Sequence, residues 1–184
     1  MVLADATLML LLIRPSTPVP GDGKGVPPDN VKERIDYLIN TLENSNTKIL
    51  IPTPVLSELL IRSKSGAADI IDKLAKYAVF EICPFDTLAA IELAEIAKAE
   101  LGKKRADDAT TYAKIKFDRQ IVAIAKVKKV RTIYSDDGDV HALAKRHKIT
   151  AVRIRDLPLP PAKEKPRELA GQGVLDFTPP ELES

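Results

Sequence analysis

The stretch RTIYSDDGDVHALAKRHKITAVRI, residues 131–154, contains a complete strand–helix–strand unit. Residues 131–134 and 150–154 are short runs rich in β-branched and apolar residues, which are typical of strands. Between them, residues 135–138 have the composition of a turn, and residues 140–147 predict a short helix that ends in basic residues. Strands that follow one another through a helix pair in parallel, so this stretch predicts an α/β fold.

The same alternation of strand and helix continues toward the N-terminus. Three more strands are expected at residues 2–4, 48–51 and 79–83, which gives a five-stranded, mainly parallel sheet covered on both faces. The helical periodicity between them predicts a helix that Asn30 caps and that reaches Leu42, helices at 55–63 and 66–77, a helix that Asp86 caps and that runs to about Leu101, and a helix that Asp118 begins.

Two segments lie outside this pattern. Residues 14–29 carry five prolines and three glycines without helical or strand periodicity, which predicts a loop insertion. Prolines also dominate from residue 158 onward, and we expect residues 158–184 to be an extended tail. At 184 residues the chain fits one domain with some length to spare. We therefore expect residues 1–157 to form the folded domain.

Cysteine content and hydropathy indicate a cytoplasmic protein with no membrane association. Cys83 is the single cysteine, so no internal disulfide can form. The apolar run at residues 6–13 is too short to span a bilayer, and no basic residue precedes it.

Four acidic residues occupy positions from which they can face one crevice. Asp5 ends the first strand, Asp137 follows the fourth, Asp118 opens the helix before the fourth, and Glu58 follows the second strand by about two helical turns. The functional crevice of a parallel sheet lies at the carboxyl ends of its strands. Carboxylates that converge repel one another unless a cation neutralises them, so this pattern predicts a metal site with oxygen ligands, suited to Mg²⁺ or Mn²⁺.

Several polar residues in this region also have a structural explanation. Asp118 considered alone could simply cap the helix that it begins, and Asp5 could cap a helix after the first strand. Ser135 could orient a carboxylate or a water molecule, or serve only the turn. His141 and His147 lie in a basic helix, where a surface or helix-end role is the favoured interpretation, and this disfavours zinc.

The positive charge is concentrated in one part of the chain. The net charge is only +2, yet residues 103–155 contain 15 Lys and Arg against 6 Asp and Glu. A basic region beside an acidic metal site suits a polyanionic substrate such as RNA. Aromatic residues make up 4% of the chain and tryptophan is absent, so contacts with the nucleic acid backbone should outweigh base stacking.

Four segments together resemble the PIN-domain family of nucleases. They are VLADA around Asp5, IPTPVLSELL around Glu58, KIKFDRQIVAIA around Asp118 and IYSDD ending at Asp137. The resemblance covers about residues 1–157. It implies a PIN-like three-layer α/β/α sandwich and a Mg²⁺- or Mn²⁺-dependent endoribonuclease whose ligands are Asp5, Glu58, Asp118 and Asp137, with Asp139 as an auxiliary ligand.

Many small PIN-domain proteins resemble VapC, the ribonuclease toxin of type II toxin–antitoxin pairs. This resemblance implies a homodimer and an antitoxin protein as a partner. The insertion at residues 14–29 and the tail from residue 158 depart from the minimal toxin pattern, so substrate and partner can differ from those of the toxins.

Two other functions compete with that of a ribonuclease. One is a non-catalytic PIN-like module that binds RNA or protein. The other is a Mg²⁺-dependent phosphatase or receiver-type domain, although Thr7 stands where a phosphatase motif would place a second aspartate. The glycines at residues 21–25, GDGKG, fit neither a Walker motif nor a dinucleotide-binding motif.

Overall fold

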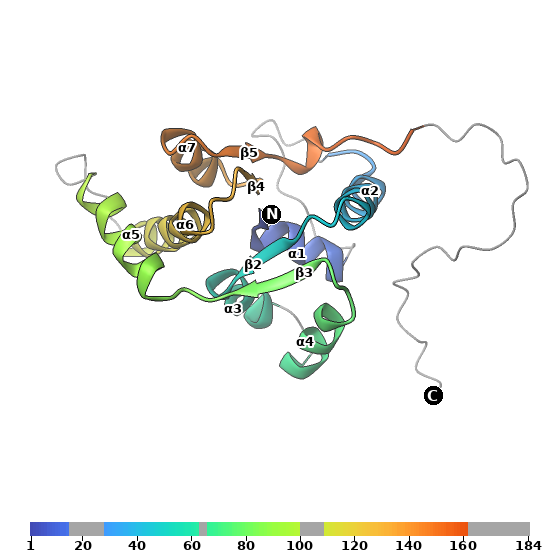
Figure 1. The fold of residues 1–184 in the computed structure, drawn as a ribbon, viewed down its shortest axis with the longest axis horizontal. Coiled ribbons are helices and arrows are strands. Elements are labelled where there is room, and N and C mark those ends of the chain that lie inside the picture. Colours follow the sequence, from blue (N-terminus) through green and yellow to red (C-terminus); the bar gives the residue numbers. More distant parts are fainter. Residues whose placement is uncertain (15–27, 63–65, 100–108, 162–184) are drawn as a thin grey trace, which may run out of the picture.

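The protein folds around a five-stranded sheet, as a computed structural model of the chain shows (Figure 1). The structure describes residues 1–14, 28–62, 66–99 and 109–161. The strands are β1 (Val2–Ala4), β2 (Ile49–Pro52), β3 (Phe80–Cys83), β4 (Thr132–Tyr134) and β5 (Thr150–Val152), and their order in the sheet is β3-β2-β1-β4-β5. All neighbouring strands pair in parallel, which confirms the predicted fold class.

In the described part of the chain, seven helices lie between the strands and one 3-10 turn follows the last strand. The helices group on two sides of the sheet: Figure 1 shows α5, α6 and α7 together at the left and α1, α2 and α4 at the right and below. This arrangement is a three-layer sandwich. The bounds are α1 (Ala6–Ile13), α2 (Val31–Asn44), α3 (Thr53–Arg62), α4 (Ala67–Ala75), α5 (Thr87–Lys98), α6 (Ala109–Val127), α7 (Gly138–Arg146) and η1 (Ile154–Asp156).

The core lies on both faces of the central strands. All residues of β1 and β2 are buried, as expected where helices cover both sides of a parallel sheet. Five consecutive residues of α1, from Leu8 to Leu12, are also buried. This helix directly follows a central strand and packs against both α2 and α3. None of the described helices combines the length and apolar character needed to cross a membrane.

One predicted helix start and one predicted helix cap were wrong. The helix that contains Asp118 begins nine residues earlier than predicted, at Ala109, because Ala and Lys, which favour helix, recur in the polar stretch between residues 109 and 118. Asn30 precedes α2 but has φ 49°, and its side chain bonds to Asp29 instead of capping the helix.

Smaller differences concern the ends of elements. Pro52 belongs to β2 and α3 begins at Thr53, whereas α7 begins at Gly138 because Asp137 caps it. Most of the predicted insertion (residues 15–27), most of the predicted tail (residues 162–184) and residues 100–108 lie outside the described residues. After β5, Ile154 and Leu157 are buried, and the Leu157 carbonyl accepts a hydrogen bond from Arg34 of α2.

We predict that Ile51→Ala lowers the free energy of unfolding by about 2–5 kcal/mol, because it leaves a cavity in a central strand whose Ile51 is fully buried. The matched control is Ile61→Ala in α3, where the side chain is 80% exposed and the expected change is within about 0.5 kcal/mol. Urea unfolding of both variants measures the difference. Equal losses would contradict the placement of β2 in the core.

Candidate metal centre at the ends of β1 and β4

The candidate site lies where the chain reverses its direction across the sheet. Strands β2 and β3 lie on one side of β1 in the sheet, whereas β4 pairs with the other side of β1. The register aligns Ala4 with Tyr134, so Asp5 and Ser135 are the first residues beyond the two strands at the same level. Such a reversal opens a crevice at the carboxyl ends of the strands, which is the usual binding region of an α/β sheet.

Asp5 is buried at the N-terminus of α1. Its side chain accepts a hydrogen bond of 3.0 Å from the amide of Leu8 and thereby caps the helix. Burial raises the pKa of Asp5 to about 6, and the nearby charge of Asp136 adds to this rise. Hydrogen bonds from the Ser135 side chain and from the amides of Leu8 and Thr7 act in the opposite direction.

Ser135 connects Asp5 to the turn after β4. The residue is buried, and besides its hydrogen bond to Asp5 its Oγ accepts one of 3.1 Å from the amide of Asp137. The sequence left open whether Ser135 orients a carboxylate or serves the turn, and the structure shows that it does both.

Two further contacts fix the backbone of this turn. His141 Nε2 lies 2.6 Å from the carbonyl oxygen of Ser135, and because a carbonyl only accepts, Nε2 must carry the proton. Asp136 accepts a hydrogen bond of 3.0 Å from the amide of Ile154, and burial raises its pKa. Sequence reasoning missed both roles, since each depends on a contact across the folded turn that no spacing indicates.

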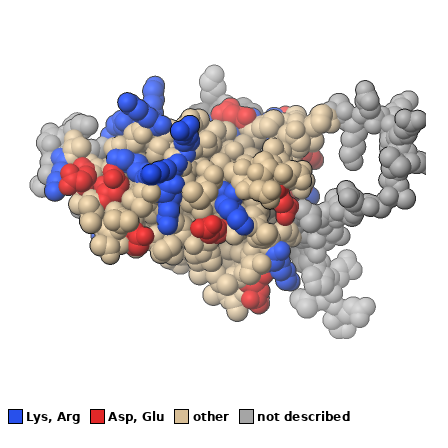
Figure 2. All heavy atoms as spheres, in the orientation of Figure 1, with Lys and Arg blue, Asp and Glu red and all other residues tan. Residues whose placement is uncertain are grey.

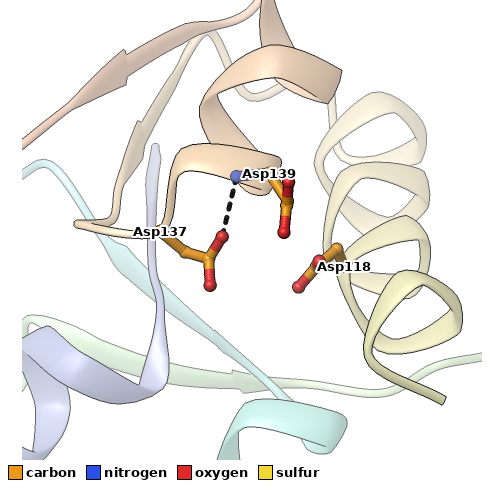
Figure 3. A group of neighbouring side chains, drawn as sticks. All are labelled: Asp118, Asp137 and Asp139. Carbon is orange, nitrogen blue, oxygen red and sulfur yellow. Dashed lines mark hydrogen bonds between the residues drawn. The ribbon is translucent and has the colours of Figure 1, made fainter. Parts of the chain in front are cut away.

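Three carboxylates meet next to this turn. Oxygens of Asp118, Asp137 and Asp139 all lie within 4.8 Å of one another. Asp118 comes from the buried face of α6, Asp137 caps α7 through a hydrogen bond of 2.8 Å from the amide of Asp139, and Asp139 lies in the first turn of α7. Figure 3 shows the three side chains pointing toward one another from the two helices.

These three carboxylates have the donor chemistry of a site for a hard divalent cation. They offer only oxygen, and one residue is buried, one is half-buried and one is exposed, so an ion could keep part of its hydration shell. Three like charges at this separation repel one another strongly in a partly buried position. A divalent cation would relieve this repulsion, and the residues therefore fit Mg²⁺ or Mn²⁺.

The other two predicted ligands, Asp5 and Glu58, do not belong to the group of three. Asp5 is linked to it through Ser135. Glu58 lies in α3 and forms an ion pair of 2.9 Å with Arg62 on the exposed side of that helix. The complete set of four ligands therefore stays a prediction. Asp86, which the sequence excluded from the site, caps α5 as expected.

The fold is similar to those of several solved structures. VapBC2 from Rickettsia felis, bound to a DNA fragment from its promoter, matches with a TM-score of 0.54 and 16% identity, over 83% of this chain and 98% of that chain. DNA-bound VapBC from Salmonella typhimurium gives 0.53 and 16%, over 83% and 97%. FitAcB from Neisseria gonorrhoeae gives 0.50 and 19%, over 84% and 98%.

No protein-family model and no curated protein sequence matches the chain. At these identities the structural likeness concerns the fold alone. It confirms the VapC-like, PIN-type fold that the sequence resemblance implied.

We predict that Asp5→Asn stabilises the metal-free protein at pH 8 by up to about 3 kcal/mol and changes little at pH 4. The pKa of Asp5 is about 6 in the folded protein against an ordinary 3.8, so folding favours the protonated form. Wild-type stability therefore falls as the pH rises from about 4 through about 6. Asparagine retains the helix cap without the charge.

Urea unfolding in EDTA at the two pH values measures this effect. A variant that is less stable than wild type at pH 8 would show that the charged form of Asp5 supports the fold.

We also predict that Mn²⁺ raises the unfolding temperature of the wild type and not that of Asp118→Asn. At a hundredfold excess over the dissociation constant, binding adds about 2.7 kcal/mol, or roughly 5–10 °C for a domain of this size. Asp86→Asn, whose residue only caps α5, is the matched control and should respond as the wild type does. An equal shift for Asp118→Asn would place the cation elsewhere.

Proposed function

We propose that this protein is a Mg²⁺- or Mn²⁺-dependent endoribonuclease. The observation that carries the proposal is the group formed by Asp118, Asp137 and Asp139, whose oxygens lie within 4.8 Å of one another at the carboxyl edge of a PIN-type sheet. Three acidic side chains from two helices form this group without any histidine or cysteine. Such a donor set suits phosphodiester hydrolysis better than redox or zinc chemistry.

The chain contributes positioning rather than a nucleophile. Asp118, Asp137 and Asp139 would hold the cation, and we include Asp5 and Glu58 as further ligands of the complete site. A bound Mg²⁺ or Mn²⁺ supplies Lewis-acid activation of water and of the phosphate. In the reaction a water oxygen forms a bond to phosphorus, the bond from phosphorus to the leaving oxygen breaks, and the proton of water passes to solvent or to that oxygen.

Ser135 and His141 are positioning residues in this proposal. Ser135 joins Asp5 to the Asp137 amide, and His141 holds the Ser135 carbonyl. Together they fix the turn that carries two of the three grouped carboxylates. Preorganised ligands reduce the reorganisation that the site must undergo before it reacts.

Charge supports RNA as the substrate. Residues 103–155 hold the excess of Lys and Arg, and Figure 2 shows basic side chains gathered at the upper left, over the region of α6 and α7. This is the region from which Asp118 and Asp137 come. Basic side chains around an acidic centre attract the phosphate backbone of a nucleic acid. A bound cation would offset the negative charge of the centre itself.

The comparisons support a toxin–antitoxin setting as part of this proposal. Two of the similar structures are VapBC assemblies bound to DNA, which agrees with the VapC-like pattern of the sequence. We therefore propose a cytoplasmic protein that pairs with an antitoxin and forms a homodimer. Copurification with the product of a neighbouring gene and light scattering of the purified protein test these two points.

We predict that the purified protein cleaves labelled RNA with Mn²⁺ and that EDTA abolishes cleavage. Asp118→Asn and Asp137→Asn should each lower the rate at least about a hundredfold, because each removes a charged ligand from the proposed centre. Asp86→Asn should cleave as the wild type does, since its residue caps α5 and does not belong to the group. Retained activity in both site variants would refute the proposed centre.

The wild type could also bind RNA without cleaving any tested sequence under these conditions. Binding without cleavage would refute the endonuclease proposal and favour a non-catalytic RNA-binding module.

A further inference from the structure

A second feature of α7 extends from about one turn after Asp137 to the end of the helix that lies away from the carboxylates. A pocket of about 540 Å³ opens between α7 and β5, and the residues that line it include His141, Lys145, Lys148 and Thr150. The remaining lining residues are aliphatic, and no Asp or Glu is among them. Its volume falls within the range of small-ligand sites.

The two lysines have the properties of anion-binding groups. Both are exposed, and within the described ranges of the chain neither ammonium group lies within ion-pair distance of a carboxylate. Other lysines do form such pairs: Lys32 with Asp36, Lys98 with Glu95, and Lys126 with Glu92. No carboxylate of the described residues therefore pairs with Lys145 or Lys148 in the pocket that they line.

The polar side chains between the lysines and the turn suit an anion as well. Thr150 offers a hydroxyl group that can donate a hydrogen bond, and it is exposed. His141 belongs to both places, because it lines the pocket and its Nε2 is held by the Ser135 carbonyl. The pocket thus begins one helical turn from the cap residue Asp137.

The length of α7 relates the pocket to the carboxylates. His141 lies four and Lys145 eight positions after Asp137, which corresponds to about 6 Å and about 12 Å along the helix axis. A nucleic acid strand that rises about 3.4 Å per nucleotide covers the longer distance in about four nucleotides. A single short RNA strand can therefore reach both ends of α7.

We propose that this pocket is a phosphate-binding subsite for the RNA strand, several nucleotides away from the phosphodiester that lies at the carboxylates. This inference rests on the proposed function and adds to it the direction in which the strand runs, along α7 toward the turn before β5. Lys145, Lys148 and Thr150 contact the phosphate backbone, so the subsite adds affinity without reading sequence.

The test measures RNA binding without cleavage. A fluorescent 12-nucleotide RNA is titrated in EDTA with wild type, with the double variant Lys145→Gln/Lys148→Gln, and with a charge-preserving double variant, Lys145→Arg/Lys148→Arg. The matched control is Lys73→Gln/Lys76→Gln, a pair with the same spacing at the end of α4, on the other side of the molecule. Circular dichroism confirms that each variant is folded.

The expected result is quantitative. Two lost phosphate contacts lower the slope of log affinity against log salt concentration by about 1.4, at about 0.7 per contact for a single strand, and weaken binding roughly tenfold at moderate salt. The arginine variant and the Lys73/Lys76 control should bind as the wild type does. Unchanged affinity and slope in the glutamine variant would overturn the proposal.

Two more outcomes separate this inference from the proposed function. Cleavage by wild type in Mn²⁺ together with unaltered binding by the glutamine variant overturns the subsite alone. Salt-sensitive binding that depends on the two lysines, with no cleavage in Mn²⁺, retains the subsite and overturns the nuclease. Binding of a polyglutamate peptide, but not RNA, at the two lysines would assign the pocket to an acidic polypeptide and overturn the RNA proposal.

Discussion

The pairing of β1 with β4 is the constraint on which the rest of the structure depends. β1 has three residues, all buried, and it holds the middle position of the sheet with β2 on one side and β4 on the other. Strands β2 and β3 lie on one side of β1, and β4 and β5 lie on the other. Such a change of direction opens a crevice at the carboxyl ends of β1 and β4. The register then fixes which residues meet there: Ala4 lies opposite Tyr134, and the next residues, Asp5 and Ser135, form a hydrogen bond.

This pairing places the carboxyl group of Asp5 in a buried position, where folding does not favour a charge. Asp5 caps α1, which an uncharged residue could do as well, yet its burial raises its pKa to about 6. Asp118 likewise occupies the buried stripe of α6 beside Ile121 and Val122. Burying an acidic side chain costs solvation free energy. Two buried acidic residues at one edge of the sheet, next to Asp137 and Asp139, have a common explanation if a cation belongs there.

The sequence predicted the strands well because short buried runs between helices leave few alternatives. The ligands predicted from the sequence include Asp118, Asp137 and Asp139, which lie close together in the structure, although Asp118 was expected at a helix start that the structure moves to Ala109. The contacts of Ser135, Asp136 and His141 could not be predicted, since they depend on the φ and ψ angles of one turn and on its distance from β5. Glu58 lies in the helix that its sequence context predicted, but its ion pair with Arg62 could not be predicted.

The charges of α7 have a simpler explanation that must be weighed against a binding role. Acidic residues near the N-terminus of a helix and basic residues near its C-terminus both interact favourably with the helix dipole, each by about 0.3–1 kcal/mol. Asp137, Asp139 and Lys145 satisfy this rule. The dipole, however, acts only within the last turn and does not account for Lys148, which lies beyond the helix and lines the same pocket as Lys145. Nor does it account for Asp118, which comes from another helix to meet the acidic end. At each end of α7 a residue from outside the helix thus adds to its charge, and a ligand at each end explains this better than helix stability does.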